Sequence, residues 1–231
     1  MERPNLKYVT GIITAAAMLF GAASSAQAAD DIVSAVDCCT FAGGPFSQAA
    51  GEKPLFVNPQ GSGFVPHNVT ANSKGPDGNP LFESDTISEG ETSPVEGAQY
   101  LSAGTYPFVC TIHPPGMRGE LIVAGGTALP RPKIAFSIPS QKLKQVRKTG
   151  KVKVKVKALT AASSIKLDVL KGKLKAGSTT IKSLAKGASR TIAVKLTKKG
   201  KKAIRKGKKV PLSGKATVAF GKSASARRTL R

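Results

Sequence analysis

Residue types that bind metals are scarce in this chain of 231 residues. It has two histidines, three cysteines and three methionines. Two imidazoles can complete one metal site at most, which excludes catalytic centres that hold several metal ions on many histidines. The positions of these few side chains are therefore more informative than their number.

Long apolar segments are lacking after the N-terminus. The first residues contain Arg3 and Lys7, an apolar run over about 9–20, and small residues that end in Ala26-Gln27-Ala28. This order is typical of a signal peptide with an A-x-A cleavage site, and the run is short for a membrane span; a buried core helix is the alternative. We expect a signal peptide over 1–29, an exported protein (periplasmic, envelope-associated or extracellular), and no transmembrane helix in the mature chain.

Acidic residues are almost absent from the second half of the chain. Residues 127–231 contain 31 Lys and Arg against one acid, a net charge of +30, whereas residues 29–126 contain three basic residues against eleven acids, a net charge of −8. A change this large indicates two modules with different partners. Two glycines and two spaced prolines at 125–132 have linker composition. We expect domains over 30–126 and 133–231, joined by a linker over 127–132.

The acidic module contains short β-rich segments separated by turn residues. They cover 54–58, 66–71, 105–110 and 119–123. The intervening residues are rich in Gly, Pro, Asn and Ser, and no helical period persists. This spacing predicts an antiparallel β-sandwich or barrel.

The basic module also has the period of β-strands. Residues 151–157 alternate lysine and valine, which predicts a strand with one buried face. Similar patterns occur at 133–138, 165–170, 191–196 and 215–220. We expect a second β-sandwich with a short helix within 198–209 and a frayed C-terminal tail, so the whole chain is predicted to be all-β.

One loop contains three of the scarce residues. Cys110, His113 and Met117 follow the end of a predicted strand, and the only other histidine, His67, begins another. Thiolate, imidazole and thioether are ligands that suit copper, and two His with one Cys and a weak axial Met form a blue-copper constellation. Zinc is the competing metal. Without a metal, the cysteine and methionine would be core residues and His113 a surface residue.

Two motifs resemble a known family. The sequences PHNV (66–69) and YPFVCTIHPPGMRG (106–119) are similar to those of the plastocyanin–amicyanin branch of the cupredoxins, the type 1 blue copper proteins. The resemblance covers about 30–126 and implies a Greek-key β-sandwich. It implies one copper ion held by His67, Cys110, His113 and, axially, Met117. It further implies that Asn68 hydrogen-bonds toward Thr111 and ties the ligand segments together.

The implied function is one-electron transfer through a Cu(I)/Cu(II) couple in the cell envelope, with redox partner proteins that the sequence does not identify. Related oxidases need many more histidines, so we expect that the chain is not an enzyme. Copper storage or delivery without electron shuttling is the alternative, and a metal-free structural domain is a third hypothesis. The spacing differs from the family: three residues separate His113 from Met117, against two in amicyanin-type loops and four in plastocyanin-type loops.

The remaining cysteines, Cys38 and Cys39, are adjacent in the sequence. A vicinal disulfide, a link to another chain and buried thiols in the first strand all fit this pair. Nothing else indicates a redox dithiol, which favours a buried or structural role.

The basic module loosely resembles the lysine-rich, immunoglobulin-like (Ig-like) sandwiches appended to secreted bacterial proteins. Its charge predicts anchoring or docking on anionic envelope polymers or lipid headgroups. The acidic module of the same chain is another candidate partner, and a merely solvated surface is the alternative. Nucleic acid is disfavoured, because Phe136 and Phe220 are the only aromatic residues available to stack on bases.

Overall fold

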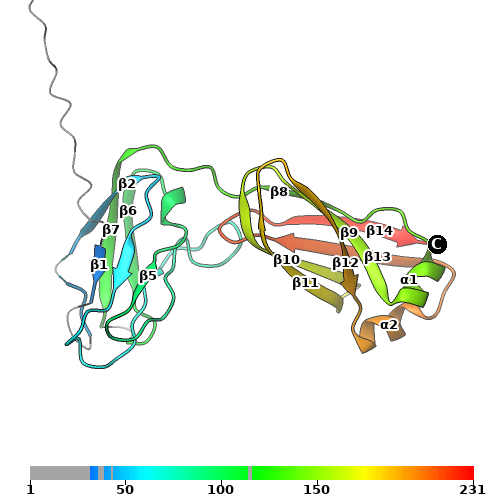
Figure 1. Ribbon diagram of the computed structural model, residues 1–231, viewed down its shortest axis with the longest axis horizontal. Helices are drawn as coiled ribbons and strands as arrows, with labels where there is room; N and C mark the ends of the chain where they lie inside the picture. The colour runs from blue at the N-terminus through cyan, green and yellow to red at the C-terminus, as the bar shows by residue number, and fades with distance from the viewer. Residues whose placement is uncertain (1–31, 36–38, 43, 114–115) are drawn as a thin grey trace, which may run out of the picture.

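The computed structural model describes residues 32–35, 39–42, 44–113 and 116–231. The chain is all-β, as predicted, and its strands form β-sandwiches. Buried hydrophobic residues form one cluster between Val33 and Val123 and another between Ile134 and Leu230. Below, the residues up to 126 are the N-terminal domain and residues 133–231 the C-terminal domain (Figure 1). The expected signal peptide, 1–29, lies outside the described residues.

Two sheets form the N-terminal domain. The first has the order β1-β3-β5, with β1 at Ile32–Ser34, β3 at Leu55–Val57 and β5 at Thr92–Pro94. The second has the order β2-β7-β6-β4, with β2 at Phe46–Ala50, β7 at Arg118–Gly126, β6 at Gly104–Val109 and β4 at Thr70–Ala71. A 3-10 helix, η1, covers Ala98–Tyr100. The expected antiparallel pairing is found at β3–β5, β4–β6 and β6–β7, whereas β1–β3 and β2–β7 pair in parallel.

An aromatic cluster around Phe108 fills this sandwich. The Phe41 ring lies 5.0 Å from the Phe108 ring in an edge-to-face arrangement, and Phe46 and Phe82 lie at 6.0 and 6.2 Å. Gly119 is the residue opposite Phe108 on β7. A Cβ atom at Gly119 would come within 2.7 Å of Phe108 Cε2, so glycine is needed for the ring to approach the strand this closely.

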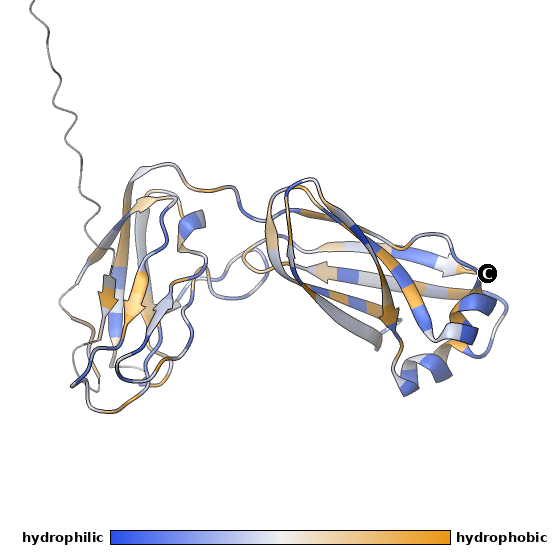
Figure 2. Cartoon of the chain, viewed as in Figure 1, coloured by the Kyte–Doolittle hydropathy of each residue, from blue (hydrophilic) through white to orange (hydrophobic). Residues whose placement is uncertain are grey.

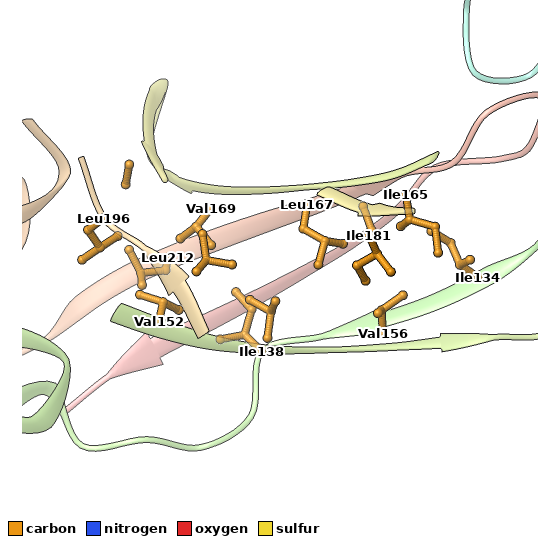
Figure 3. Close-up of a cluster of buried hydrophobic side chains, with 14 of the residues drawn as sticks. Ile134, Ile138, Val152, Val156, Ile165, Leu167, Val169, Ile181, Leu196 and Leu212 are labelled. Carbon is orange, nitrogen blue, oxygen red and sulfur yellow. The ribbon is translucent and has the colours of Figure 1, made fainter. Parts of the chain in front are cut away.

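Two antiparallel sheets form the C-terminal domain. One has the order β12-β9-β8, with β12 at Ser189–Lys195, β9 at Lys151–Ala158 and β8 at Ile134–Ser137. The other has the order β11-β10-β13-β14, with β11 at Leu174–Leu184, β10 at Ala162–Lys171, β13 at Val210–Thr217 and β14 at Ala224–Leu230. Hydrophobic and hydrophilic residues alternate along these strands (Figure 2). The hydrophobic ones meet between the sheets, where Figure 3 shows Val152 and Val156 on one side and Leu167 and Val169 on the other.

The C-terminal tail is ordered, so its predicted fraying is wrong. Residues 224–230 form β14, which pairs with β13 along its whole length, and Leu230 is buried. The Arg231 carbonyl accepts a hydrogen bond of 2.6 Å from the Leu143 N–H, at the start of helix α1 (Leu143–Thr149). This helix was not expected. The predicted helix within 198–209 is α2 (Lys198–Ile204), capped by the Thr197 hydroxyl, which accepts from the Gly200 N–H.

The turn between β13 and β14 joins the two domains. The Phe220 N–H donates to the Asp77 carboxylate at 2.9 Å, and the Phe220 carbonyl accepts from the Arg131 guanidinium at 3.3 Å. The Phe220 ring lies 6.3 Å from the Tyr100 ring. Phe220 adopts a φ of 57°, which is rare for a bulky residue, so packing and hydrogen bonds together hold this turn in place.

No helix in the described part of the chain is long and apolar enough to cross a membrane.

Candidate metal site

Cys110 is placed by strand β6 and by the loop that follows it. The strand alternates, so Phe108 and Cys110 share the buried face, and neither is more than 1% exposed. The Cys110 N–H donates to the Met117 carbonyl at 3.0 Å and thereby closes the loop 110–117. The sulfur is therefore held at the end of the aromatic core.

His67 comes from a segment far away in the sequence. Its backbone pairs with Ile87 through two hydrogen bonds, His67 N–H to Ile87 carbonyl at 3.0 Å and the reverse bond at 2.9 Å. The His67 side chain is fully buried. The predicted strand over 66–71 is replaced by two short pieces: β4 at Thr70–Ala71 and, before it, an isolated bridge at His67 that positions the imidazole.

His113 lies on the loop, where its carbonyl accepts hydrogen bonds from the N–H groups of Gly116 and Met117 at 3.1 and 3.3 Å. The His113 ring lies 5.0 Å from the His67 ring. The His113 side chain is partly exposed, whereas that of Met117 is fully buried. The loop therefore presents one imidazole at the surface and a thioether inside.

The two imidazoles converge on the thiol. Nδ1 of His67 lies 3.8 Å from Cys110 Sγ and Nδ1 of His113 lies 3.9 Å from it. One ligand atom from each of these three residues lies within 4.8 Å of the others. Within the described residues this is the only group of histidine, cysteine and acidic side chains with that geometry.

These distances fit a bound first-row metal ion. With metal bonds of about 2.3 Å to sulfur and about 2.05 Å to nitrogen, the two separations correspond to ligand–metal–ligand angles of about 120–127°. Tetrahedral angles would need separations of about 3.6 Å. The three donors could therefore hold one first-row metal ion between them.

Asn68 links the two ligand-bearing segments. Its Oδ1 accepts from the Thr111 N–H at 2.9 Å, and its Nδ2 donates to the hydroxyl oxygens of Thr111 and Thr86 at 2.8 and 3.0 Å. Its own N–H donates to Cys110 Sγ at 3.5 Å and so helps to orient the sulfur. The hydrogen bonding toward Thr111 that the family resemblance implied is present, and Thr86 is a partner that the sequence did not indicate.

Cys39 does not belong to this site. Cys38 lies outside the described residues. Cys39 is exposed, so the interpretation as a buried thiol does not hold for this residue.

The comparisons with known proteins return no family model and no curated protein that matches the chain. Among solved structures, a DUF3823 family protein from Parabacteroides merdae is 13% identical, with 80% of this chain and 96% of that one covered and a TM-score of 0.27. Fibronectin(III)-like modules of Clostridium thermocellum CbhA are 12% identical, with 80% and 88% covered and a TM-score of 0.22. Neither is a copper protein.

These findings correct the identification made from the sequence. The resemblance implied relatives among cupredoxins, and the matching structures are a DUF3823 protein and fibronectin(III)-like modules instead. The assignment to the type 1 copper family is therefore wrong, and so are the one-electron carrier function and its alternative of copper storage or delivery. The resemblance rests on two short motifs, which constrain a few side chains and leave the rest of the chain undetermined. The arrangement of His67, Cys110 and His113 is a property of this chain and does not depend on a family.

Proposed function

We propose that the N-terminal domain binds one transition-metal ion through His67 Nδ1, Cys110 Sγ and His113 Nδ1. The observation that carries the proposal is the convergence of two imidazole nitrogens on one buried sulfur at 3.8 and 3.9 Å. A thiol has one proton and can donate to only one of them. The second imidazole could contact the sulfur only by donating its own Nδ1–H to it, whereas a shared metal ion would account for both contacts through the lone pairs of all three donors.

Copper is the ion that we propose, with zinc as the competitor. A thiolate with two imidazoles accommodates either metal, and the thioether of Met117 as a fourth, weaker ligand favours copper. The bound ion would cross-link the His67 segment to the loop after Cys110. Binding is then coupled to the stability of the domain, because the unfolded chain does not present the three donors together.

Metal titration of the full chain tests the proposal. We expect one Cu(I) or Zn(II) ion per chain by calorimetry, with a higher unfolding temperature. At a free-metal concentration of 1,000 times Kd the stabilisation is about 4 kcal/mol, equivalent to roughly 15–30 °C for a domain of this size. Cys110→Ser should abolish the shift.

The chain offers a matched control for this substitution. The double variant C38S/C39S also removes thiols but leaves the three donors intact, so it should bind and respond as the parent does. Full binding by Cys110→Ser, or loss of binding in C38S/C39S alone, would assign the metal to other residues and contradict the proposal.

A second proposal concerns the C-terminal domain and its partners. Its charge of +30 supports binding to anionic polymers of the cell envelope, with lipid headgroups as the other source of negative charge. Export itself, and the absence of an enzymatic activity, stay predictions from the sequence. Retention of the full chain on an anionic polymer at low ionic strength, and its release by salt, is the expected result.

A further inference from the structure

Lysines form a straight row on one sheet of the C-terminal domain. Strand β9 is the central strand of the β12-β9-β8 sheet, and its burial alternates without exception. Val152, Val154 and Val156 are fully buried. The exposed positions between and around them are Lys151, Lys153, Lys155 and Lys157. At about 3.4 Å per residue the ammonium-bearing positions recur every 7 Å or so, over about 20 Å.

Small side chains flank this row. On β12, the residues opposite the lysines at 153, 155 and 157 are Ala193, Thr191 and Ser189. On β8, the residues opposite those at 155 and 157 are Ser137 and Ala135. All five are exposed. An extended chain can therefore lie along β9 within reach of the ammonium groups without meeting bulky neighbours.

The lysines of this row repel one another, and no acidic side chain of the C-terminal domain neutralises them. Lys195 on β12 lies directly opposite Lys151, and like charges in that position destabilise a sheet. Charges about 7 Å apart are also within the screening length of physiological salt. Within 127–231, all of which the structure describes, Asp168 is the only acid. It lies on the other sheet, where it pairs with Lys175 at 3.3 Å.

The backbone under the lysines is held on both sides. Beyond the end of β8, the side chain of Gln141 takes the place of a strand: its Nε2 donates to the Lys153 carbonyl and its Oε1 accepts from the Lys153 N–H, both at 2.9 Å. On the other side Lys153 pairs with Ala193. The backbone of the row is therefore fixed before any ligand arrives, so binding has to order only the lysine side chains.

We propose that this surface binds a linear polyanion that lies extended along β9, with its negative charges facing successive lysines. We call the surface the lysine face, and it consists of Lys151, Lys153, Lys155, Lys157 and Lys195. The proposal rests on the anionic partner proposed above for the C-terminal domain. It adds which surface of the domain binds that partner, and that the partner is an extended linear chain. Phe136 packs against the core and Phe220 contacts the other domain. Neither can stack on bases at this face, which favours a polymer without aromatic groups, and a polyol phosphodiester is the ligand that we infer.

Poly(glycerol phosphate) binding by the full chain tests this inference. The variant K153Q/K155Q/K157Q removes three charges from the lysine face. The matched control K166Q/K182Q/K215Q removes three charges from the outer face of the other sheet, where all three lysines are exposed. At about 1 kcal/mol per lysine, the first variant should bind about 100-fold more weakly. Its slope of log K against log salt should fall by about 2, and the control should change little.

The outcomes separate this inference from the broader proposal. Equal losses in the two variants, with both folded by circular dichroism, would overturn the lysine face and leave polyanion binding intact. No binding of the parent at low salt would overturn both. Tighter binding to vesicles of phosphatidylglycerol, or to single-stranded DNA, than to poly(glycerol phosphate) would replace the proposed ligand with a membrane or a nucleic acid.

Discussion

Replacing Asn68 by alanine should damage both the stability of the N-terminal domain and its affinity for metal. The side chain is 6% exposed and makes three hydrogen bonds of 2.8–3.0 Å to Thr111 and Thr86. Its removal also leaves the Thr111 N–H without its acceptor. At about 0.5–1.5 kcal/mol per bond, we expect a loss of about 2–3 kcal/mol in the free energy of unfolding.

The effect on metal binding follows from the same contacts. Asn68 fixes the position of the residue after Cys110 and donates its own N–H to the sulfur. Groups that orient metal ligands in this way typically change affinity by about 10–100-fold when they are removed. Asn68→Ala retains the backbone N–H and all three donors, so we expect weaker binding with the stoichiometry unchanged.

Tyrosine fluorescence provides a domain-specific assay. The chain has no tryptophan, and after residue 8 its only tyrosines are Tyr100 and Tyr106, both in the N-terminal domain. Urea unfolding followed by tyrosine emission gives the stability, and competition with a chelator gives the affinity. Asn72→Ala, at an exposed position, is the matched control. Unchanged stability and affinity in Asn68→Ala would refute the view that this side chain supports the site.

Three further predictions concern other parts of the molecule. Gly119→Ala should destabilise the N-terminal domain by about 1–3 kcal/mol, because the new Cβ would collide with the Phe108 ring. We expect a lower urea midpoint, and an unchanged midpoint would show that the ring moves freely. Partial burial of this largely exposed side chain, followed by the negative charges of two nearby aspartates, raises the pKa of Glu83 above its ordinary value of 4.5. The ionised carboxylate is therefore disfavoured in the folded state, so Glu83→Gln should raise the urea midpoint at neutral pH. Below pH 4.5 the carboxyl is protonated in both the folded and the unfolded state, so the variant should lose this gain in stability. A gain that persists in acid would contradict the assignment. Phe220→Ala should loosen the coupling between the domains, because it removes the ring beside Tyr100 and leaves only the two backbone hydrogen bonds of residue 220. We expect a shorter rotational correlation time for each domain by ¹⁵N relaxation, and equal times in variant and parent would show that the ring does not hold the domains together.

The strands that the sequence predicted best are those with strict alternation. Residues 151–157 place valine and lysine on opposite faces, and β9 follows this period along its length. Strand β14 was missed because its serines, alanines and arginines carry no such period. It is held by its pairing with β13 and by the burial of Leu230, which are contacts between residues that lie apart in the sequence.

The donor residues could be named from the sequence, but not the contacts that hold them. Scarce histidines and the Cys110 loop indicated the ligand types. The pairing of His67 with Ile87 and the bond from Asn68 to Thr86 connect segments about 20 residues apart, and no local pattern marks them. The family could not be inferred safely, because a handful of ligand residues can be shared by chains that have little else in common.

X-ray absorption spectroscopy of the metal-loaded full chain tests the central claim most directly. Bound at the proposed site, the ion should have one sulfur at about 2.3 Å and two imidazole nitrogens at about 2.0–2.1 Å. The sulfur contribution at this distance should vanish in Cys110→Ser and persist in C38S/C39S. A metal surrounded only by nitrogen and oxygen, or a sulfur at about 2.3 Å that survives the loss of Cys110, would contradict the account.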